Sequence, residues 1–397
     1  MNAKTNVTVP SRDFQRAISV AARLINRKNA LPVLADVLLK WNGEAWTITS
    51  SNSEAWLTLP LPTMSLIDHR VDDKVSTAQK IEVCVHATSL LQALQRLPDV
   101  VLQICFNEDN HTMQVQYMTG EQTTGQFSMP TDCADEYPQP LAIEKPEVEI
   151  TEQGSVLLPM IKAARVAVAQ DELRPIMGTV CIDLASEEYA VVASDGHMLI
   201  ADQHFRGAGY LKGQPQGVKL HKSILDTLLQ AFGGVENLTI KATSQLVEIG
   251  ADGGLQLVCR PIDAKYPNWR SVIPQNQPMM VTLCKDSLIQ TVQRVALFSN
   301  DSSNLIRLQF NGTVLTIEAE DYDFQRTAHE SLSLQDTNMT DNFAIGVKAS
   351  TLLDVLSTVK TENIHLLLVD ARHAMVIKEE DVNAKYTGLC MPMLLND

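Results

Sequence analysis

Apolar and polar positions recur along the chain in one pattern. A short alternating run, which predicts a strand, is followed by apolar residues at helical spacing and then by further alternating runs. The pattern begins at VTVPSRDFQRAISVAARLI (7–25), VEITEQGSVLLPMIKAARVAVA (148–169) and MMVTLCKDSLIQTVQRVALFS (279–299). The chain therefore contains a threefold repeat whose units each open with a strand and an amphipathic helix.

Each repeat continues into a second half of the same order. These halves begin at IEVCVHATSLLQALQRL (81–97), GVKLHKSILDTLLQAFG (217–233) and FAIGVKASTLLDVLSTVK (343–360). The pattern predicts six strand–helix–strand–strand–strand units, too small to bury a core singly and therefore paired into three domains. The fold class is α+β, with helices on one side of antiparallel sheets. The expected domains are 1–143, 144–275 and 276–397, and the polar stretch 68–80 is expected to be a loop insertion.

The cations of the first predicted helix share one side. Arg12, Arg16 and Arg23 are spaced i, i+4 and i+11, so at about 100° per residue they lie within roughly 40° of one another. Apolar residues, among them Phe14 and Ile18, occupy the opposite side. We expect this helix to bury its apolar stripe against a sheet and to present a row of arginines to solvent.

The formal charge is distributed unevenly along the chain. The six predicted helices are 11–25, 87–97, 155–170, 219–232, 284–298 and 349–360. Their charges sum to +7, which leaves −22 for the rest of a chain whose formal charge is −15. Helices gathered on one wall would therefore attract phosphates, while the remaining surface would repel them. Aromatic residues make up only 5 % of the chain, which favours loose phosphate contact over base stacking.

Composition limits the class of protein. A chain of 397 residues with 45 % apolar and 20 % charged residues is typical of a folded protein of two or three domains. No apolar run reaches the roughly 18 residues that span a membrane, and the first residues have no apolar signal-peptide region. The seven cysteines are scattered without a CxxC pair, which indicates reduced thiols in the cytoplasm. The nine histidines have no metal-ligand spacing, so neither a metal nor a cofactor is expected.

The most site-like string is Ser194-Asp195-Gly196-His197. One hypothesis is a hydrolytic enzyme that uses Asp195 and His197 as acid and base, and another is a protein-only scaffold. The chain contains no GxSxG, HExxH, P-loop or GxGxxG motif to support catalysis. Because Asp-Gly is a common turn dipeptide, a turn with a partly exposed histidine is the simpler interpretation. The contrast between basic helices and an acidic remainder disfavours both alternatives.

Five strings in order along the chain resemble the DNA polymerase III beta subunit family, the bacterial sliding clamps. They are ALPVLADVLL (30–39), RPIMGTV (174–180), VVASDGHMLI (191–200), YPNWRSVIPQN (266–276) and CMPML (390–394). The resemblance implies a non-catalytic processivity factor that acts as a head-to-tail homodimeric ring around duplex DNA. It implies as partners double-stranded DNA of any sequence, a second copy of the chain, the polymerase III catalytic subunit, the clamp loader and other proteins with a clamp-binding motif.

The resemblance also assigns residues to three surfaces. The DNA-lining residues are expected to be Arg12, Arg16, Arg23, Arg27, Lys28, Arg96, Lys162, Arg165, Lys222 and Arg294. The partner-peptide pocket is expected to comprise Arg174, Ile176, Met177, Ser194, Gly196, His197, Met198, Leu199, Pro267, Val272, Met391, Pro392 and Met393. The dimer interface is expected to contain Phe127, Leu297 and Phe298.

The chain departs from the family's pattern at three places. Met198 stands where family members often have arginine, and Thr88 stands where a basic residue that meets DNA is expected. The tail also continues through Leu394–Asp397, whereas the familiar tail ends soon after a basic residue.

Overall fold

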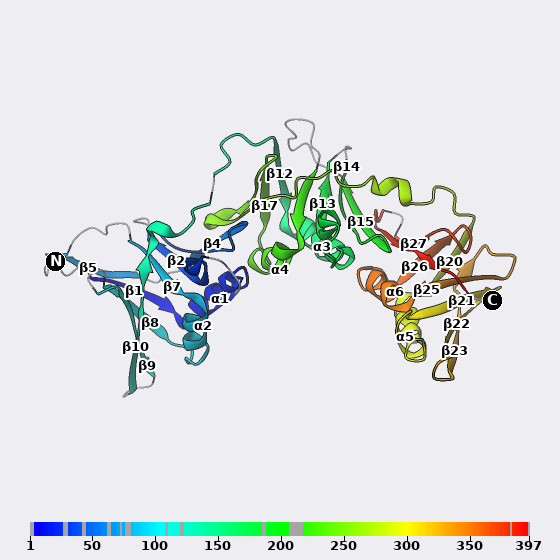
Figure 1. Cartoon of the computed structure of the whole chain (residues 1–397), viewed down its shortest axis with the longest axis horizontal. Helices are drawn as coiled ribbons and strands as arrows, with labels where there is room; N and C mark the ends of the chain where they lie inside the picture. The colour runs from blue at the N-terminus through cyan, green and yellow to red at the C-terminus, as the bar shows by residue number, and fades with distance from the viewer. Residues whose placement is uncertain are drawn as a thin grey trace. The chain divides into compact units, whose positions relative to one another are not determined.

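The computed structural model describes most of the chain (Figure 1). The described residues are 4–26, 31–41, 45–61, 65–71, 74–75, 81–107, 110–119, 123–140, 142–184, 188–205, 217–381 and 383–395. The chain divides into two compact units. The first unit is formed by Met1–Val156, Tyr210–Gly213 and Ser223–Pro261, and the second by Leu157–Gly209, Gln214–Lys222 and Ile262–Asp397.

The predicted order of strand, helix and three strands recurs six times in the described residues. The first pair of halves is β1 (Lys4–Pro10), α1 (Ser11–Ala22), β2 (Asp36–Trp41), β3 (Trp46–Ser51) and β4 (Ala55–Leu61), then β7 (Ile81–His86), α2 (Ala87–Gln95), β8 (Val101–Asn107), β9 (Thr112–Thr119) and β10 (Thr123–Pro130). The second pair is β12 (Val148–Gln153), α3 (Gly154–Ala164), β13 (Thr179–Asp183), β14 (Glu188–Ser194) and β15 (Met198–Phe205), then β16 (Val218–His221), α4 (Lys222–Ala231), β17 (Asn237–Ala242), β18 (Val247–Ala251) and β19 (Leu255–Cys259). The third pair is β20 (Met279–Cys284), α5 (Lys285–Ala296), β21 (Leu305–Asn311), β22 (Val314–Asp321) and β23 (Arg326–Ser333), then β25 (Phe343–Lys348), α6 (Ala349–Leu356), β26 (Asn363–Leu368), β27 (Met375–Glu379) and β28 (Thr387–Cys390).

Helix α1 forms as its sequence predicts. Phe14, Ile18 and Ala21 are buried, whereas Arg12 and Arg16 are exposed on the other side. The buried side packs against strands β1 to β4, and α1 also contacts α2. The apolar stripe therefore fixes the orientation of the helix and leaves its arginines facing solvent.

The first strand of each half is exchanged into the sheet of the other half. In the first pair, β1 pairs with β8 and β7 pairs with β2. The second pair repeats this as β12 with β17 and β16 with β13, and the third as β20 with β26 and β25 with β21. A half therefore cannot complete its sheet without its partner half.

Each compact unit contains a joint at which strands from consecutive pairs of halves meet. In the first unit β4 pairs with β19, and in the second β15 pairs with β28, both antiparallel. The resulting nine-stranded sheets run β11-β7-β2-β3-β4-β19-β18-β17-β12 and β16-β13-β14-β15-β28-β27-β26-β20-β24, with β11 (Asp132–Cys133) and β24 (Asp336–Thr337) at their ends. Because these sheets cross the borders of the three expected domains, the boundaries at 143 and 275 stay a prediction.

Two smaller sheets complete the units, and one of them corrects an expectation. In the first unit the order is β10-β9-β8-β1-β5-β6, and in the second β23-β22-β21-β25-β29, with β29 at Pro392–Met393. The end of β5 (Ser65–Val71) and all of β6 (Lys74–Val75) fall in the stretch 68–80 that was expected to be a loop. The edge of β1 that does not face β8 pairs with β5 in an antiparallel register, and this backbone pairing makes the stretch a strand.

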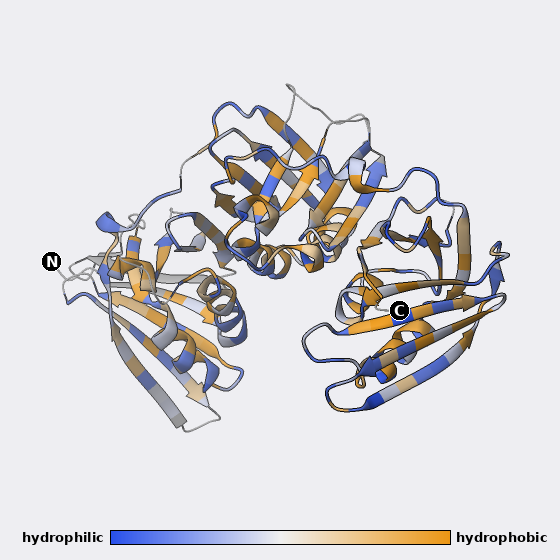
Figure 2. Ribbon diagram, turned by 45° about the vertical axis from the view of Figure 1, so that its right-hand side comes forward, coloured by the Kyte–Doolittle hydropathy of each residue, from blue (hydrophilic) through white to orange (hydrophobic). Residues whose placement is uncertain are grey.

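Apolar and polar residues alternate along the strands (Figure 2). The burial of β8 and β26 follows the same period of two, with Leu102 and Ile104 buried in the first and Ile364 and Leu366 in the second. One side of each such strand therefore faces the core. No helix among the described residues is long and apolar enough to cross a membrane.

Asp36 is a buried carboxyl group at the start of β2. Its side chain is 5 % exposed, and its register partner on β7 is His86. Burial, followed by the charge of Asp132, raises the pKa of Asp36 from 3.8 to about 6, and His86 opposes that rise. The Asp36 carboxyl also shares a hydrogen bond with Asp132. The folded chain therefore holds a proton here that the unfolded chain releases at lower pH.

We expect this proton to make stability depend on pH. The contribution of Asp36 is fully present below its unfolded pKa and is lost as the pH rises through its folded pKa of about 6. Asp36→Asn keeps a hydrogen bond to Asp132 without a buried charge, so at about pH 8 it should raise the free energy of unfolding by on the order of 2 kcal/mol. Urea unfolding of both proteins measures the difference, which should shrink toward about pH 4. A difference that is constant with pH would contradict the assignment.

Candidate functional site

The turn between β14 and β15 is built by its own polar side chains. Oδ1 of Asp195 accepts hydrogen bonds from the backbone N–H groups of His197, at 2.7 Å, and Met198, at 2.8 Å. Ser194 Oγ donates to the carbonyl of Met198 and accepts from the N–H of Gly196. Gly196 has φ +91°, a conformation that glycine adopts without strain. The Asp195 carboxylate therefore stabilises the turn.

Two other segments fix this turn from either side. Nη2 of Arg174 donates to the carbonyl of Asp195 at 3.1 Å and pairs with Asp171, also at 3.1 Å. The N–H of Met391 donates to the carbonyl of His197 at 2.8 Å. These bonds bring together three of the sequence strings that lie up to about two hundred residues apart in the chain.

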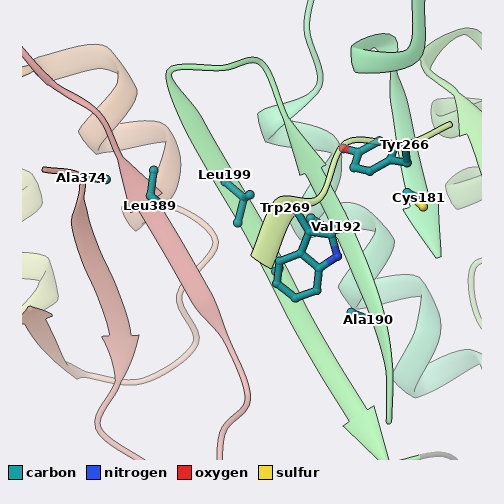
Figure 3. Close-up of a cluster of buried hydrophobic side chains, with 9 residues drawn as sticks. Cys181, Ala190, Val192, Leu199, Tyr266, Trp269, Ala374 and Leu389 are labelled. Carbon is teal, nitrogen blue, oxygen red and sulfur yellow. The ribbon is translucent and has the colours of Figure 1, made fainter. Parts of the chain in front are cut away.

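An apolar cluster lies on the face of the second nine-stranded sheet beneath the segment between β19 and β20. Its buried members are Cys181, Ala190, Val192, Leu199, Ala201, Tyr266, Trp269, Ala374 and Leu389, with Ile176 and Ile273 packed against them. Figure 3 shows the short helix η6 (Trp269–Val272) crossing β14 and β15 with the Trp269 ring in this cluster. The pocket predicted from sequence would have this cluster as its floor.

The expected pocket residues differ in exposure. Arg174, Gly196, His197, Pro267, Val272 and Met391 are exposed; Ile176, Met177, Ser194, Pro392 and Met393 are partly buried; Met198 and Leu199 are buried. Met198 is only 7 % exposed because β15 pairs with β28 at this position, opposite Cys390. By contrast, Val272 is 53 % exposed and Met391 40 % exposed. Exposed apolar side chains beside a buried apolar floor are suited to receiving apolar groups of a partner.

Sequence reasoning missed the residues that hold this site in place. Asp183 accepts a hydrogen bond from Nε1 of Trp269 at 2.8 Å and also pairs with Arg270. Lys219, itself buried, donates to the carbonyl of Ala264 at 2.7 Å. The YPNWR string indicated the segment, but nothing local in the sequence links it to an aspartate more than eighty residues earlier.

Most of the expected DNA-lining cations that the structure describes are exposed. These are Arg12, Arg16, Arg23, Arg96, Lys162 and Arg165, whereas Arg27 and Lys28 lie outside the described residues. Lys222 is partly buried, and its amine donates to the carbonyls of Ala169 and Gln170. Arg294 pairs with Glu330 on β23. The charges of Lys222 and Arg294 are thus partly engaged within the chain itself.

The expected interface residues lie on two elements. Phe127 is partly buried on β10, opposite Val115. Leu297 and Phe298 follow α5 and are 74 % and 41 % exposed. Two large apolar side chains exposed in succession at the end of a helix are suited to contact with another surface.

The described residues offer little support for catalysis at the turn. His197 is exposed, and Asp195 Oδ1 is occupied by backbone N–H groups. No cluster of three or more His, Cys, Asp or Glu side chains in the described part of the chain could hold a metal ion. The turn is therefore a shaped surface rather than an acid–base pair.

Two models of known families match this chain. The model of the DNA polymerase III beta subunit, N-terminal domain, matches residues 5–141, and that of the DNA polymerase III beta subunit, C-terminal domain, matches residues 270–394. Together these matches span about two thirds of the chain. The chain belongs to the bacterial beta sliding clamp family.

Relatives and solved structures cover nearly the whole clamp. A beta sliding clamp of Pseudomonas aeruginosa is 24 % identical over 98 % of this chain and 99 % of its own length. The beta sliding clamp of Escherichia coli K12 is 26 % identical over 68 % of this chain and 71 % of its own length. The DnaN sliding clamp of P. aeruginosa bound to griselimycin matches with a TM-score of 0.87 at 22 % identity, covering 98 % and 100 % of the two chains. The beta subunit of Thermotoga maritima matches with a TM-score of 0.84 at 18 % identity, covering 99 % and 100 %.

Membership in the family establishes the class of activity. Beta sliding clamps are non-catalytic processivity subunits of DNA polymerase III, and the family implies DNA and a polymerase as partners. The expected recognition, α+β fold class and non-enzymatic function are thereby confirmed. The assignment of individual residues to surfaces of the clamp stays a prediction.

The hydrogen bonds of the turn predict different effects for its two polar residues. Asp195→Ala leaves two backbone N–H groups without their acceptor and should lower the free energy of unfolding by about 1–2 kcal/mol. His197→Ala removes an exposed side chain and should change stability by less than about 0.5 kcal/mol. Urea unfolding of the two variants checks this. Equal stability of Asp195→Ala and the parent would mean that the turn does not depend on the carboxylate.

Proposed function

We propose that two copies of this clamp close head to tail into a ring around duplex DNA and present a pocket for peptides of partner proteins. The ring is inferred from the strand pairing that recurs between consecutive pairs of halves. In both joints the last strand of a first half, β4 or β15, pairs with the last strand of the second half in the next pair, β19 or β28. The same rule would pair β23 with β10.

Both of those strands end their sheets. Strand β10 is first in the order of the six-stranded sheet, and β23 is first in that of the five-stranded sheet. An unpaired edge strand is a template for pairing with another chain. Addition of β23 of one protomer to β10 of its partner, made twice, would close a two-protomer ring by a head-to-tail contact.

Apolar side chains near these edges support the same contact. Leu297 and Phe298 follow α5, the helix that packs against β22 and β23. Phe127 lies on β10 itself. Burial of three large apolar groups at each contact would add to the backbone hydrogen bonds of the joined strands.

The exposed cations support contact with phosphates. Arg12 and Arg16 on α1 are exposed, as is Arg23 at its C-terminal cap, and Lys162 and Arg165 are exposed on and just after α3. The rest of the chain is strongly acidic, so DNA would be attracted to the helices alone. A closed ring needs no tight grip, since it cannot leave DNA sideways, and a diffuse positive lining would permit sliding.

The apolar surface beside the turn supports a peptide-binding role. Val272 and Met391 are exposed, and each lies within three residues of a member of the buried cluster, Trp269 or Leu389. Methionine adapts to many related apolar ligands. The partners proposed for this pocket are the polymerase III catalytic subunit, the clamp loader and other proteins that carry the same short motif. Because these partners act on the chromosome of a bacterium, the cytoplasm is the proposed location.

The proposed interface predicts that loss of its apolar side chains shifts the protein toward monomer. Replacing Leu297 and Phe298 by alanine should weaken dimerisation by at least about tenfold, because buried apolar anchors dominate such contacts. Both side chains are exposed in the single chain, so the variant should remain folded. Sedimentation velocity measures the mass, with Leu394→Ala, another exposed leucine, as the matched control. A double variant that dimerises as tightly as the parent would place the interface elsewhere.

The ring proposal predicts topological retention on DNA. Clamp loaded by its cognate loader should remain on circular DNA and be lost when the circle is linearised. Changing Arg12, Arg16 and Arg23 to Glu should reduce the loaded fraction several-fold while the dimer persists, because phosphate contacts are lost. Gel filtration measures the loaded fraction as the clamp that co-elutes with DNA, before and after linearisation. Gel filtration of the free protein shows whether the dimer persists. Specific binding to one duplex sequence, or retention that ignores linearisation, would contradict encirclement.

A further inference from the structure

The segment between β19 and β20 is positioned mainly by side chains. Its only helix or strand is η6 (Trp269–Val272), and its backbone hydrogen bonds within Ile262–Ile273 join near neighbours, such as Ser271 to Asn268 at 3.2 Å. Strand pairing therefore does not fix the distance between this segment and the sheet beneath it. Yet it carries Pro267 and Val272, two of the exposed residues assigned to the pocket.

One carboxylate holds the middle of this segment. Oδ2 of Asp183 accepts from Nε1 of Trp269 at 2.8 Å and from the guanidinium of Arg270, which lies 4.2 Å from the centre of the Trp269 ring. The Asp183 side chain is largely buried. Charged hydrogen bonds at a site sheltered from water are stronger than neutral ones. Asp183 therefore fixes two consecutive residues at the start of η6.

The sheet beneath provides the complementary shape. Asp183 is paired with Ala190, and Cys181 with Val192, so these side chains share one face of the sheet. Small residues there, Ala190 and Ala201, leave room for the Trp269 ring, which is 5 % exposed. Figure 3 shows the Trp269 ring together with Ala190 and Val192. Lys219, opposite Cys181 on β16, adds a second anchor through its bond to Ala264.

We propose that Asp183 is a positioning residue for partner binding: through Trp269 and Arg270 it sets where η6 presents Val272 to the peptide. This inference rests on the peptide pocket of the proposed function. Asp183 itself does not face the partner, since Trp269 and Arg270 lie over it. Its effect on affinity should thus pass through Val272.

A double-mutant cycle tests this coupling. The probe is a labelled peptide from the clamp-binding segment of the cognate polymerase, titrated against full-length protein. Asp183→Asn should weaken binding about tenfold, the loss of roughly one charged hydrogen bond. Val272→Ala should weaken it by a similar factor. If Asp183 acts through Val272, the double variant should be little weaker than Val272→Ala alone. Independent, multiplicative losses would overturn the proposal, as would unchanged affinity in Asp183→Asn.

Three further measurements separate this proposal from general destabilisation and from failure of the pocket itself. Glu82→Gln breaks the 2.6 Å pair with Lys40 in the other compact unit and should leave peptide affinity unchanged. Asp183→Glu, which keeps the charge, should recover much of the affinity lost in Asp183→Asn, whereas no recovery would count against positioning.

If the parent binds no peptide, the proposed pocket fails. The anchoring is then judged by acrylamide quenching, which should increase in Asp183→Asn as Trp269 becomes exposed, and unchanged quenching would overturn it.

Discussion

Paired halves of this chain each complete the other's sheet by exchanging their first strands. Strand β1 completes the sheet that contains β8, while β7 completes the sheet that contains β2. Because backbone N–H and C=O groups must be paired when buried, neither half can stand alone. The helices α1 and α2, which connect the exchanged strands to their own halves, are thereby brought into contact.

The same backbone pairing extends the sheets beyond each pair of halves. The joints β4–β19 and β15–β28 use identical positions in the repeat, so the structure has one way of connecting its parts and applies it twice. A repeat built in this way leaves one donor edge and one acceptor edge at its ends. Those two edges are β10 and β23, which end their sheets and are the strands proposed above to join two copies.

The turn and the segment above it show how a binding surface can be assembled on such sheets. The turn between β14 and β15 is closed by Asp195 and Ser194, and the segment containing η6 is fastened by Asp183 and Lys219. All four polar groups are used in shaping the backbone. The exposed side chains beside them include the apolar Val272 and Met391 as well as Arg174 and His197, a mixture that suits the peptide-binding role proposed above.

The helices of this chain carry a net positive charge, whereas the rest of the chain is net negative. The arginine row of α1 follows from residue spacing alone, since spacing fixes which residues share a helix face. The structure changes the interpretation of two cations: Lys222 holds the carbonyls of Ala169 and Gln170, and Arg294 is paired with Glu330. Their spacing placed them correctly on helices, but their partners lie on other elements.

The repeated units and the helix faces could be predicted from the sequence, because hydrophobic periods of two and 3.6 residues are local properties. The family was recognised from five short strings that resemble the bacterial sliding clamps. The sequence also located the turn at Asp195–Gly196. Four features became apparent in the folded chain alone: the exchange of the first strands, the strands β5 and β6 in and beside the stretch 68–80, the burial of Met198 by β28, and the hydrogen bond from Trp269 to Asp183. Each of these depends on a partner far away in the chain, and strand pairing and buried hydrogen bonds leave no periodic signal that would identify that partner.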